Sequence, residues 1–217
     1  MNIQAPYLLL SVIVNPNDGK KTLNILRNLD VSGATIIPAR GKVDGKWLKF
    51  FELDDAAKEI YWTVILKKRG EELIKALGER LHFDKPYRGI AFTIPVFEIL
   101  GDRKKDVPES EERDDKYMYR CIIVITEKGL GDEIIDEAKI AGANGATIIN
   151  ARGSAMEEQI KFFGLEINPE KEVIMIISEE DKTDEISQSI NKKFNLEKPG
   201  HGILFTMPVE DVYGLRT

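Results

Sequence analysis

The chain contains the stretch Ser32-Gly33-Ala34-Thr35-Ile36-Ile37-Pro38-Ala39-Arg40-Gly41, and it contains this stretch again, 112 positions later, as Asn144-Gly145-Ala146-Thr147-Ile148-Ile149-Asn150-Ala151-Arg152-Gly153. Eight of the ten positions are identical. A match of this length at a fixed separation is typical of an internal repeat. It predicts that one folding unit occurs twice in the chain.

Two further blocks support the repeat. Lys49-Phe50-Phe51 returns as Lys161-Phe162-Phe163 at the same separation. Lys85-Pro86-x-x-Gly89-Ile90 returns as Lys198-Pro199-x-x-Gly202-Ile203, with one residue inserted. We therefore expect a first repeat at 1–101 and a second at 119–217. The residues between them, 102–118, are mostly charged, which is typical of an exposed linker.

Apolar periodicity predicts the elements of one repeat. In order they are a strand at 7–14, a helix marked by Leu23, Leu26 and Leu29 that ends at Gly33, strands at 34–39 and 60–66, a helix marked by Leu73, Ile74, Leu77 and Leu81, and a strand at 90–94. The second repeat gives strands at 120–126, 146–151, 172–178 and 203–207, with helices at 132–141 and 183–194. The residues between 39 and about 58 are expected to form a loop.

The order β-α-β-β-α-β is that of the ferredoxin-like fold. The predicted fold class is α+β, with two ferredoxin-like repeats. In such a unit the helices cover one face of the sheet. Strands such as Ile122-Ile123-Val124-Ile125 are apolar on both faces, so the second face should be covered by the sister repeat or by another chain. This pattern predicts a homo-oligomer of tandem chains, and it leaves open whether the oligomer is a trimer or a dimer.

Composition restricts the class of protein. The 217 residues carry a net charge of −6, which disfavours binding to nucleic acid or to an anionic membrane surface. The single cysteine, Cys121, excludes an intrachain disulfide and is expected to be a buried hydrophobe. No apolar stretch is long enough to span a membrane and the N-terminus lacks the basic start of a signal peptide. We expect a cytoplasmic protein.

Motifs of catalysis are not found. The sequence has no paired histidines with ligand spacing, no Cys-x-x-Cys and no Gly-x-Ser-x-Gly. His82 and His201 do not occupy matching places in the repeat. The sequence therefore predicts no metal site, no catalytic residue and no enzyme activity.

Two segments resemble the PII family of nitrogen-regulatory signalling proteins. The first is Gly33 to Gly41 with its copy Gly145 to Gly153, which is similar to the PII pattern Gly-x-Thr-Val-x-x-x-Lys-Gly before the T-loop. The second is the turn 85–89 with its copy 198–202, which resembles the Gly-rich PII B-loop before the last strand.

The resemblance implies a non-enzymatic sensor. PII proteins form trimers, bind adenine nucleotides between subunits, and change the shape of the T-loop, which docks on transporters or metabolic enzymes. For this chain it implies ATP, ADP or another nucleotide as a possible effector, with no certain cofactor, and loops 41–59 and 153–171 as the signalling segments. The residues that would bind the nucleotide are Thr35, Lys85, Arg88, Gly89, Thr147, Lys198, Gly200, His201, Gly202 and Arg216.

Physical chemistry supports these assignments in part. The glycines let backbone N–H groups approach a phosphate, the lysines with Arg88 and His201 add positive charge, and the threonines offer hydroxyls. The glycines could equally serve only the turn. The family has a lysine after the second glycine of the turn, where this chain has Ile90 and Ile203. Binding of ATP, of another nucleotide or of none therefore stays open.

The two loops differ in character. The first contains Lys42, Lys46 and Trp47, whereas the second contains Met156 and is acidic. These four residues are candidate partner contacts, although Trp47 could instead pack on its own domain. An alternative to a PII-like regulator is an ACT-like tandem domain that senses a free amino acid on the same fold.

Overall fold

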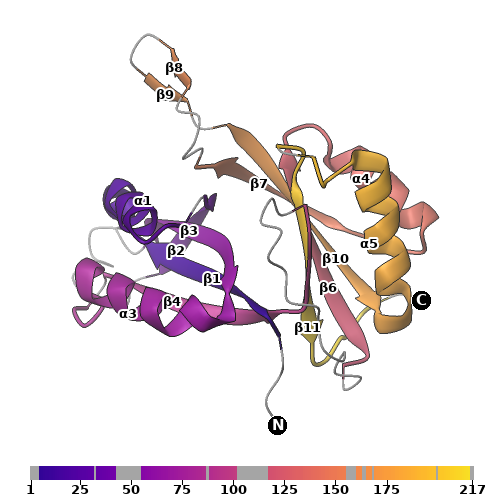
Figure 1. Cartoon of the computed structure of the whole chain (residues 1–217), viewed down its shortest axis with the longest axis horizontal. Coiled ribbons are helices and arrows are strands. Elements are labelled where there is room, and N and C mark those ends of the chain that lie inside the picture. Colours follow the sequence, from indigo (N-terminus) through magenta and orange to yellow (C-terminus); the bar gives the residue numbers. More distant parts are fainter. Residues whose placement is uncertain are drawn as a thin grey trace. The chain divides into compact units, whose positions relative to one another are not determined.

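The computed structural model describes residues 5–31, 33–42, 55–86, 88–101, 117–154, 160–162, 165–167, 169–198 and 200–215. The chain divides into two compact units. The N-terminal unit consists of Leu9–Ile94 and Ala151–Pro169, and the C-terminal unit of Met1–Leu8, Pro95–Asn150 and Glu170–Thr217. Figure 1 labels the main helices and strands of both units.

The N-terminal unit contains most of the strands and helices of the first repeat. They are β1 (Tyr7–Val14, whose first two residues belong to the C-terminal unit), α1 (Gly19–Asn28), β2 (Thr35–Lys42), β3 (Asp55–Leu66), α3 (Gly70–Leu81) and β4 (Gly89–Val96, whose last two residues belong to the C-terminal unit). Single turns of 3-10 helix, Pro16–Asp18 and Lys67–Arg69, precede the two α-helices. The strand order is β4-β1-β3-β2.

The C-terminal unit repeats this plan. Its elements are β5 (Glu98–Leu100), β6 (Tyr119–Glu127), α4 (Gly131–Ile140), β7 (Thr147–Gly153, whose last residues belong to the N-terminal unit), β10 (Glu170–Glu179), α5 (Glu180–Phe194) and β11 (Ile203–Val209). Its strand order is β7-β10-β6-β11-β5. The first four strands of this order match β2-β3-β1-β4 element by element, so the α+β fold with two ferredoxin-like repeats is confirmed.

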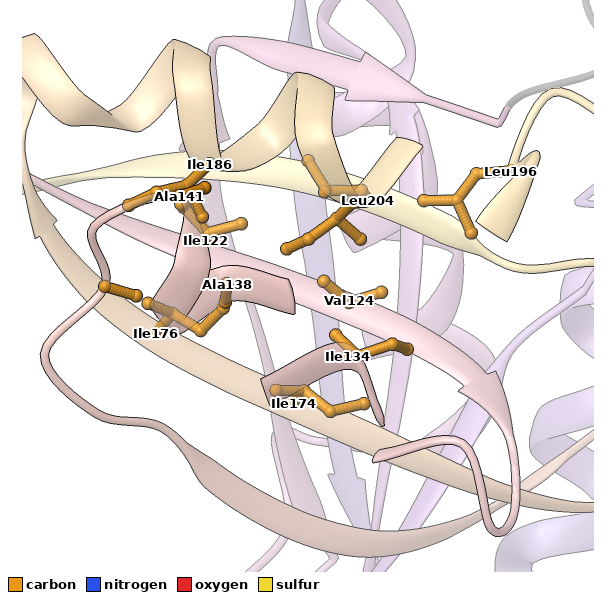
Figure 2. Packing of buried hydrophobic residues seen from close by; sticks show 12 residues of the cluster. Ile122, Val124, Ile134, Ala138, Ala141, Ile174, Ile176, Ile186, Leu196 and Leu204 are labelled. Carbon is orange, nitrogen blue, oxygen red and sulfur yellow. The ribbon is translucent and has the colours of Figure 1, made fainter. Parts of the chain in front are cut away.

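The core of the C-terminal unit lies between its sheet and its two helices. Figure 2 shows Ile122 and Val124 of β6 facing Ile134 of α4 and Ile186 of α5, and all four are fully buried. Burying side chains of this size stabilises the fold by about 1.5–3 kcal/mol each. Figure 1 shows α4 and α5 together on one face of this sheet. The helices therefore cover one face, as the periodicity predicts.

The first helix ends earlier than predicted. Gly33 does not end it, because α1 ends at Asn28. Asp30 adopts a left-handed φ of 53°, and the amide of Val31 donates to the carbonyl of Leu26 to close the helix end. Aspartate tolerates the left-handed conformation better than most residues. Asp30 can therefore occupy the left-handed position after the helix, where glycine is more common.

The first long loop is shorter than predicted. Strand β3 begins at Asp55 and not near Ile60, because β2 and β3 pair from Thr35 opposite Trp62 to Lys42 opposite Asp55. Residues 41–42 and 55–59 of the expected loop are therefore strand. Charged and small residues dominate this extension, and backbone pairing holds it without an apolar pattern.

Three short strands were not predicted. β5 pairs with β11 antiparallel, with Leu100 opposite Leu204. β8 (Ile160–Phe162) and β9 (Leu165–Ile167) form a two-stranded hairpin. Strands of three residues are too short to show alternation, which is why the sequence pattern does not reveal them.

Candidate functional site

The turn of the second repeat joins α5 to β11. Asn195 adopts a left-handed φ of 50° and ends the helix. The Lys198 amide donates to the Asn195 carbonyl at 2.9 Å, and the His201 amide donates to the Lys198 carbonyl at 3.2 Å. The side chains of Lys198 and His201 are exposed. The turn therefore presents two groups that can carry positive charge on a backbone fixed by its own hydrogen bonds.

The imidazole of His201 is oriented by the end of α5. Its Nδ1 lies 3.1 Å from the carbonyl oxygen of Phe194. A carbonyl only accepts, so Nδ1 is the nitrogen that carries the proton in this contact. A ligand would thus use Nε2. Gly200 lies beside it with a φ of 87° and has open space where a side chain would be.

The turn of the first repeat has similar geometry. His82 ends α3 with a left-handed φ of 59°, and the Lys85 amide donates to the His82 carbonyl at 3.0 Å. Lys85 and Arg88 are exposed. His82 thus occupies the place of Asn195, and Arg88 the place of His201. Each repeat presents two potentially cationic side chains after its second helix.

Backbone geometry and close packing require glycine at positions 89 and 202. Their φ angles are 144° and 140°. A Cβ on Gly89 would lie 2.3 Å from the carbonyl oxygen of Ile13, and one on Gly202 would lie 2.6 Å from that of Ile125. No side chain fits at such a distance, so the close approach to the first strand of each repeat is enough to explain both glycines.

The predicted threonines lie away from the turns. Thr35 is the first residue of β2, and Thr147 is the first residue of β7. In the N-terminal unit β2 and β4 are separated by β3 and β1, and in the C-terminal unit β7 and β11 are separated by β10 and β6. Three strand spacings correspond to roughly 14 Å. Neither unit by itself brings its threonine next to its turn.

Lys46, Trp47, Met156 and Arg216 lie outside the described residues, as do 102–116 of the linker. Lys42 is described only as the last residue of β2.

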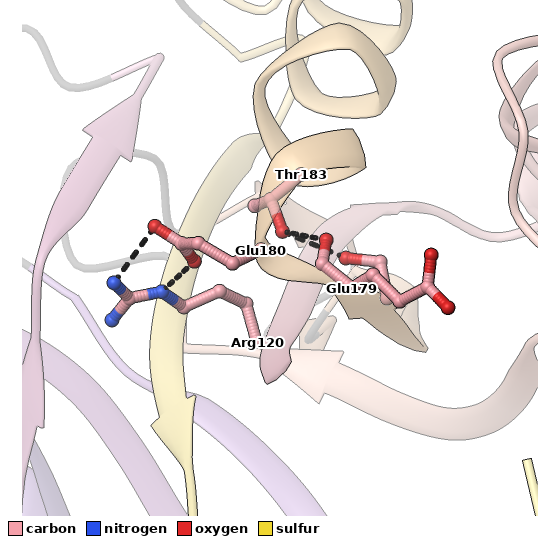
Figure 3. A network of polar contacts seen from close by, with 5 residues as sticks. Arg120, Glu179, Glu180 and Thr183 are labelled. Carbon is pink, nitrogen blue, oxygen red and sulfur yellow. Dashed lines mark hydrogen bonds and ion pairs between the residues drawn. The ribbon is translucent and has the colours of Figure 1, made fainter. Parts of the chain in front are cut away.

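Sequence reasoning missed a buried ion pair in the C-terminal unit. The Arg120 side chain is only 4% exposed, and its Nε and Nη2 bind both carboxylate oxygens of Glu180, with Nη2–Oε1 at 2.9 Å (Figure 3). The guanidinium carbon lies 4.4 Å from the centre of the Phe97 ring and 5.9 Å from that of Tyr117. The available signal was an arginine at a position of β6 where the first repeat has Leu8.

Hydroxyl groups order the start of α5 beside this pair. Thr183 donates to the carbonyl of Glu179 at 2.9 Å, and its oxygen lies 2.8 Å from the Ser178 hydroxyl (Figure 3). Since the Thr183 proton is used on the carbonyl, Ser178 is the donor between the two hydroxyls. The Glu180 amide donates to the Met118 carbonyl. These bonds fix Glu180 opposite Arg120.

A second polar cluster lies in the N-terminal unit. Glu59 of β3 accepts a hydrogen bond from the Tyr61 hydroxyl at 2.5 Å and pairs with Arg152. Burial, followed by the hydrogen bond to Glu59, raises the pKa of Tyr61 well above its usual value. The repeated Arg40 and Arg152 were visible in the sequence, but a partner on β3 was not.

Cys121 agrees with its predicted role. It is 6% exposed, and burial raises the pKa of its thiol to about 11. A thiol in this state is protonated at neutral pH and is a poor nucleophile.

Across the described ranges, no three His, Cys, Asp or Glu side chains are grouped so that they could hold a metal ion. Within the same part of the chain, no helix has the length and apolar character needed to cross a membrane.

Together these features define a protein of two ferredoxin-like α+β units, each with a cation-bearing turn before the last strand of its repeat. The family model of the nitrogen regulatory protein P-II matches residues 119–217. The matched part of the chain is similar to the P-II family. No curated protein sequence matches the chain.

Solved structures give weaker likenesses. PII from Arabidopsis thaliana, bound to citrate, is 19% identical with a TM-score of 0.38, over 51% of this chain and 95% of that one. The GlnK–ATP complex from B. subtilis is 14% identical with a TM-score of 0.34, over 42% and 84% of the two chains. An unknown protein from Galdieria sulphuraria is 12% identical with a TM-score of 0.27, over 94% and 99%. At such TM-scores these likenesses add nothing to the family match.

Proposed function

We propose that this chain is a PII-like regulator that binds a small anionic effector and signals to a protein partner through the segments 41–59 and 153–171, which include the ends of the strands that flank each loop. An adenine nucleotide is the first candidate for the effector, and a transporter or an enzyme of nitrogen metabolism is the candidate partner. The match of residues 119–217 to the P-II family is the observation that carries this proposal. The first repeat, 1–101, is then a divergent second copy, joined through the linker 102–118.

The geometry of the turn 195–202 supports an anion site. Lys198 and His201 are exposed, and Gly200 leaves open space beside them. A compact positive site on a fixed backbone suits a phosphate group. Gly202 contributes to this site by shaping the turn, since its own Cα is packed against β6. Lys85 and Arg88 offer a related arrangement in the first repeat.

Equilibrium titration of the full chain with ATP, ADP, AMP and cyclic nucleotides tests the proposal. We expect binding of at least one nucleotide, weakened by about tenfold or more when Arg88 and His201 are both replaced by alanine, since each charged hydrogen bond contributes about 1.5–3 kcal/mol. The matched control is Lys139→Gln, which removes a positive charge that pairs with Asp136 on α4 at 3.7 Å.

The possible outcomes separate the hypotheses. Folded protein that binds none of the nucleotides would contradict the nucleotide part of the proposal. Binding of a free amino acid would instead favour the ACT-like sensor. Nucleotide binding that is unchanged in the double alanine variant would move the site away from the two turns. A solution mass from light scattering distinguishes the proposed trimer or dimer from a monomer.

A further inference from the structure

The second long loop comprises residues 153–169. Its first residues are bound by backbone and side-chain hydrogen bonds to the start of strand β2 of the first repeat. Two cross-strand pairs join the end of β7 to β2: Thr35 with Gly153, and Ile36 with Arg152. The next residue, Ser154, adds two hydrogen bonds. Its amide donates to the Ala34 carbonyl at 2.8 Å, and the Ala34 amide donates to its hydroxyl oxygen at 2.8 Å. The buried Ser154 thus ties the loop to the start of β2.

An ion pair on the neighbouring strand reinforces this junction. The Arg152 guanidinium binds Oε1 of Glu59 on β3, while the Tyr61 hydroxyl donates to Oε2 of the same carboxylate. The Glu59 side chain is 13% exposed and that of Arg152 is 44% exposed. The Glu59 carboxylate therefore links β3, where its side chain is largely buried, to Arg152 at the end of β7, the strand that leads into the loop.

The carboxylate is also fixed on its other side. A Cβ on Gly19, the first residue of α1, would lie 2.5 Å from the Tyr61 hydroxyl and 2.7 Å from Glu59 Oε2. The helix start therefore packs directly on these two groups. In the C-terminal unit the corresponding Glu172 accepts the amide of Gly131 at 2.9 Å. In both repeats a glutamate on a strand therefore contacts the first residue of the first helix. In the first repeat this glutamate, Glu59, also binds Arg152.

We propose that Glu59 is a positioning residue for the second loop. Its ion pair with Arg152, which we call the latch, fixes the direction in which the chain leaves β7 and enters residues 153–169. The regulatory meaning of the latch rests on the proposed function, in which this loop signals to a partner. The latch itself does not depend on that function. The Gly153 amide donates to the Pro169 carbonyl at 2.8 Å, so both ends of the loop meet where Arg152 is held.

Release of the loop then has a defined structural requirement. A partner or an effector that moves its base must separate Arg152 from Glu59 and break the two bonds between Ser154 and Ala34. Because Arg152 is about half exposed, an approaching anion can compete with Glu59 for the guanidinium. The latch therefore lies where an effector can influence a loop that belongs to the other repeat.

Hydrogen exchange of the full chain tests the latch without any ligand. In Glu59→Gln and in Arg152→Gln we expect the amides of Gly153 and Ser154 to exchange about five- to tenfold faster than in the wild type, because local opening no longer breaks an ion pair. The two substitutions combined should exchange no faster than either alone, since they remove the same contact. Glu172→Gln is the matched control and should change the Gly131 amide but not residues 153–154.

Wild-type exchange at Gly153 and Ser154 in both single variants would overturn the latch. Equal acceleration by Glu172→Gln, or acceleration across the whole chain, would also overturn it, because the effect would then be general loosening. The conservative substitution Glu59→Asp keeps the charge and should retain part of the protection. Nucleotide titration of the same proteins is read separately, so absence of nucleotide binding contradicts the proposed function and leaves the exchange result unaffected.

Discussion

Arg120 carries a charge into a strand position that is leucine in the first repeat. Its carboxylate partner, Glu180, is 29% exposed, and Nη1 of the arginine is buried with no hydrogen-bond partner among the described residues. We expect Arg120→Leu to lower the free energy of unfolding by about 2–3 kcal/mol, because Glu180 loses its partner. Urea denaturation measures this loss.

The control for Arg120 is an exposed ion pair in the same unit. Lys193→Gln removes the contact of Lys193 with Glu137 at 2.9 Å and should lower the free energy of unfolding much less than Arg120→Leu does. The double variant Arg120→Leu with Glu180→Leu should be more stable than Arg120→Leu alone, since no charge is then left unpaired. A single variant as stable as the wild type would show that the buried pair contributes no net stability.

Cys121 makes stability depend on pH on the alkaline side. Its folded pKa is raised from 9.0 to about 11, so the folded state holds its proton while the unfolded chain releases it. The stability that the protonated Cys121 thiol contributes to folding is fully present below pH 9.0 and is lost as the pH rises through about 11. The total loss in the free energy of unfolding is on the order of 1–3 kcal/mol. Cys121→Ala should flatten this part of the stability curve. An unchanged slope in urea melts at pH 8 to 11 would contradict the assignment.

Two glycines of one turn should respond differently to a methyl group. Gly202→Ala must fit a Cβ 2.6 Å from the Ile125 carbonyl oxygen at a φ of 140°, and we expect a loss of about 2 kcal/mol or more. Gly200→Ala has open space and a φ of 87°, and should lose only about 1 kcal/mol. Thermal unfolding measures both. Equal losses would mean that the contact with β6 does not determine the choice of glycine.

The same turn separates stability from binding. Gly200 is the glycine with space beside it, so its alanine variant tests phosphate binding on a protein that stays folded. Weaker nucleotide affinity in Gly200→Ala than in the wild type is the expected result under the proposed function.

At the scale of the elements, the sequence predicted those helices and strands that have a regular spacing of apolar residues. The long strands and the α-helices of the described residues follow from apolar spacing, as in Leu73, Leu77 and Leu81 of α3, which are buried. The extension of β3 back to Asp55 was missed because backbone pairing with β2 holds it and no side-chain pattern marks it. The end of α1 was missed because Asp30 took the left-handed conformation in place of a glycine.

The polar contacts could not be predicted because they join distant parts of the sequence. Arg120 and Glu180 are brought together by β6 and α5, and Glu59 and Arg152 by pairing of β2 with the end of β7. Repeat comparison marks Arg120 as unusual and Arg152 as repeated, yet it names neither partner. The turns, whose residues are local in sequence, were the part of the candidate site that the sequence could place.

At the scale of the whole chain, the two compact units do not follow the two sequence repeats. The C-terminal unit includes Pro95–Leu100 of the first repeat, where β5 pairs with β11, and the N-terminal unit includes Ala151–Pro169 of the second. Each unit is therefore completed by a segment from the other repeat. A fragment beginning at residue 119 lacks β5 and Phe97, the ring on which Arg120 stacks.

This exchange of segments predicts the behaviour of a chain cut in its linker. After cleavage at a protease site introduced between residues 106 and 112, the two pieces should elute together in gel filtration, because β5 stays paired in the C-terminal unit and residues 151–154 stay paired with β2. Combining Glu59→Gln with Ser154→Ala removes the latch and the Ala34–Ser154 side-chain bond, and the pieces should then separate at lower urea concentration. Separate elution of the wild-type pieces without urea would show that the exchanged segments do not hold the two repeats together.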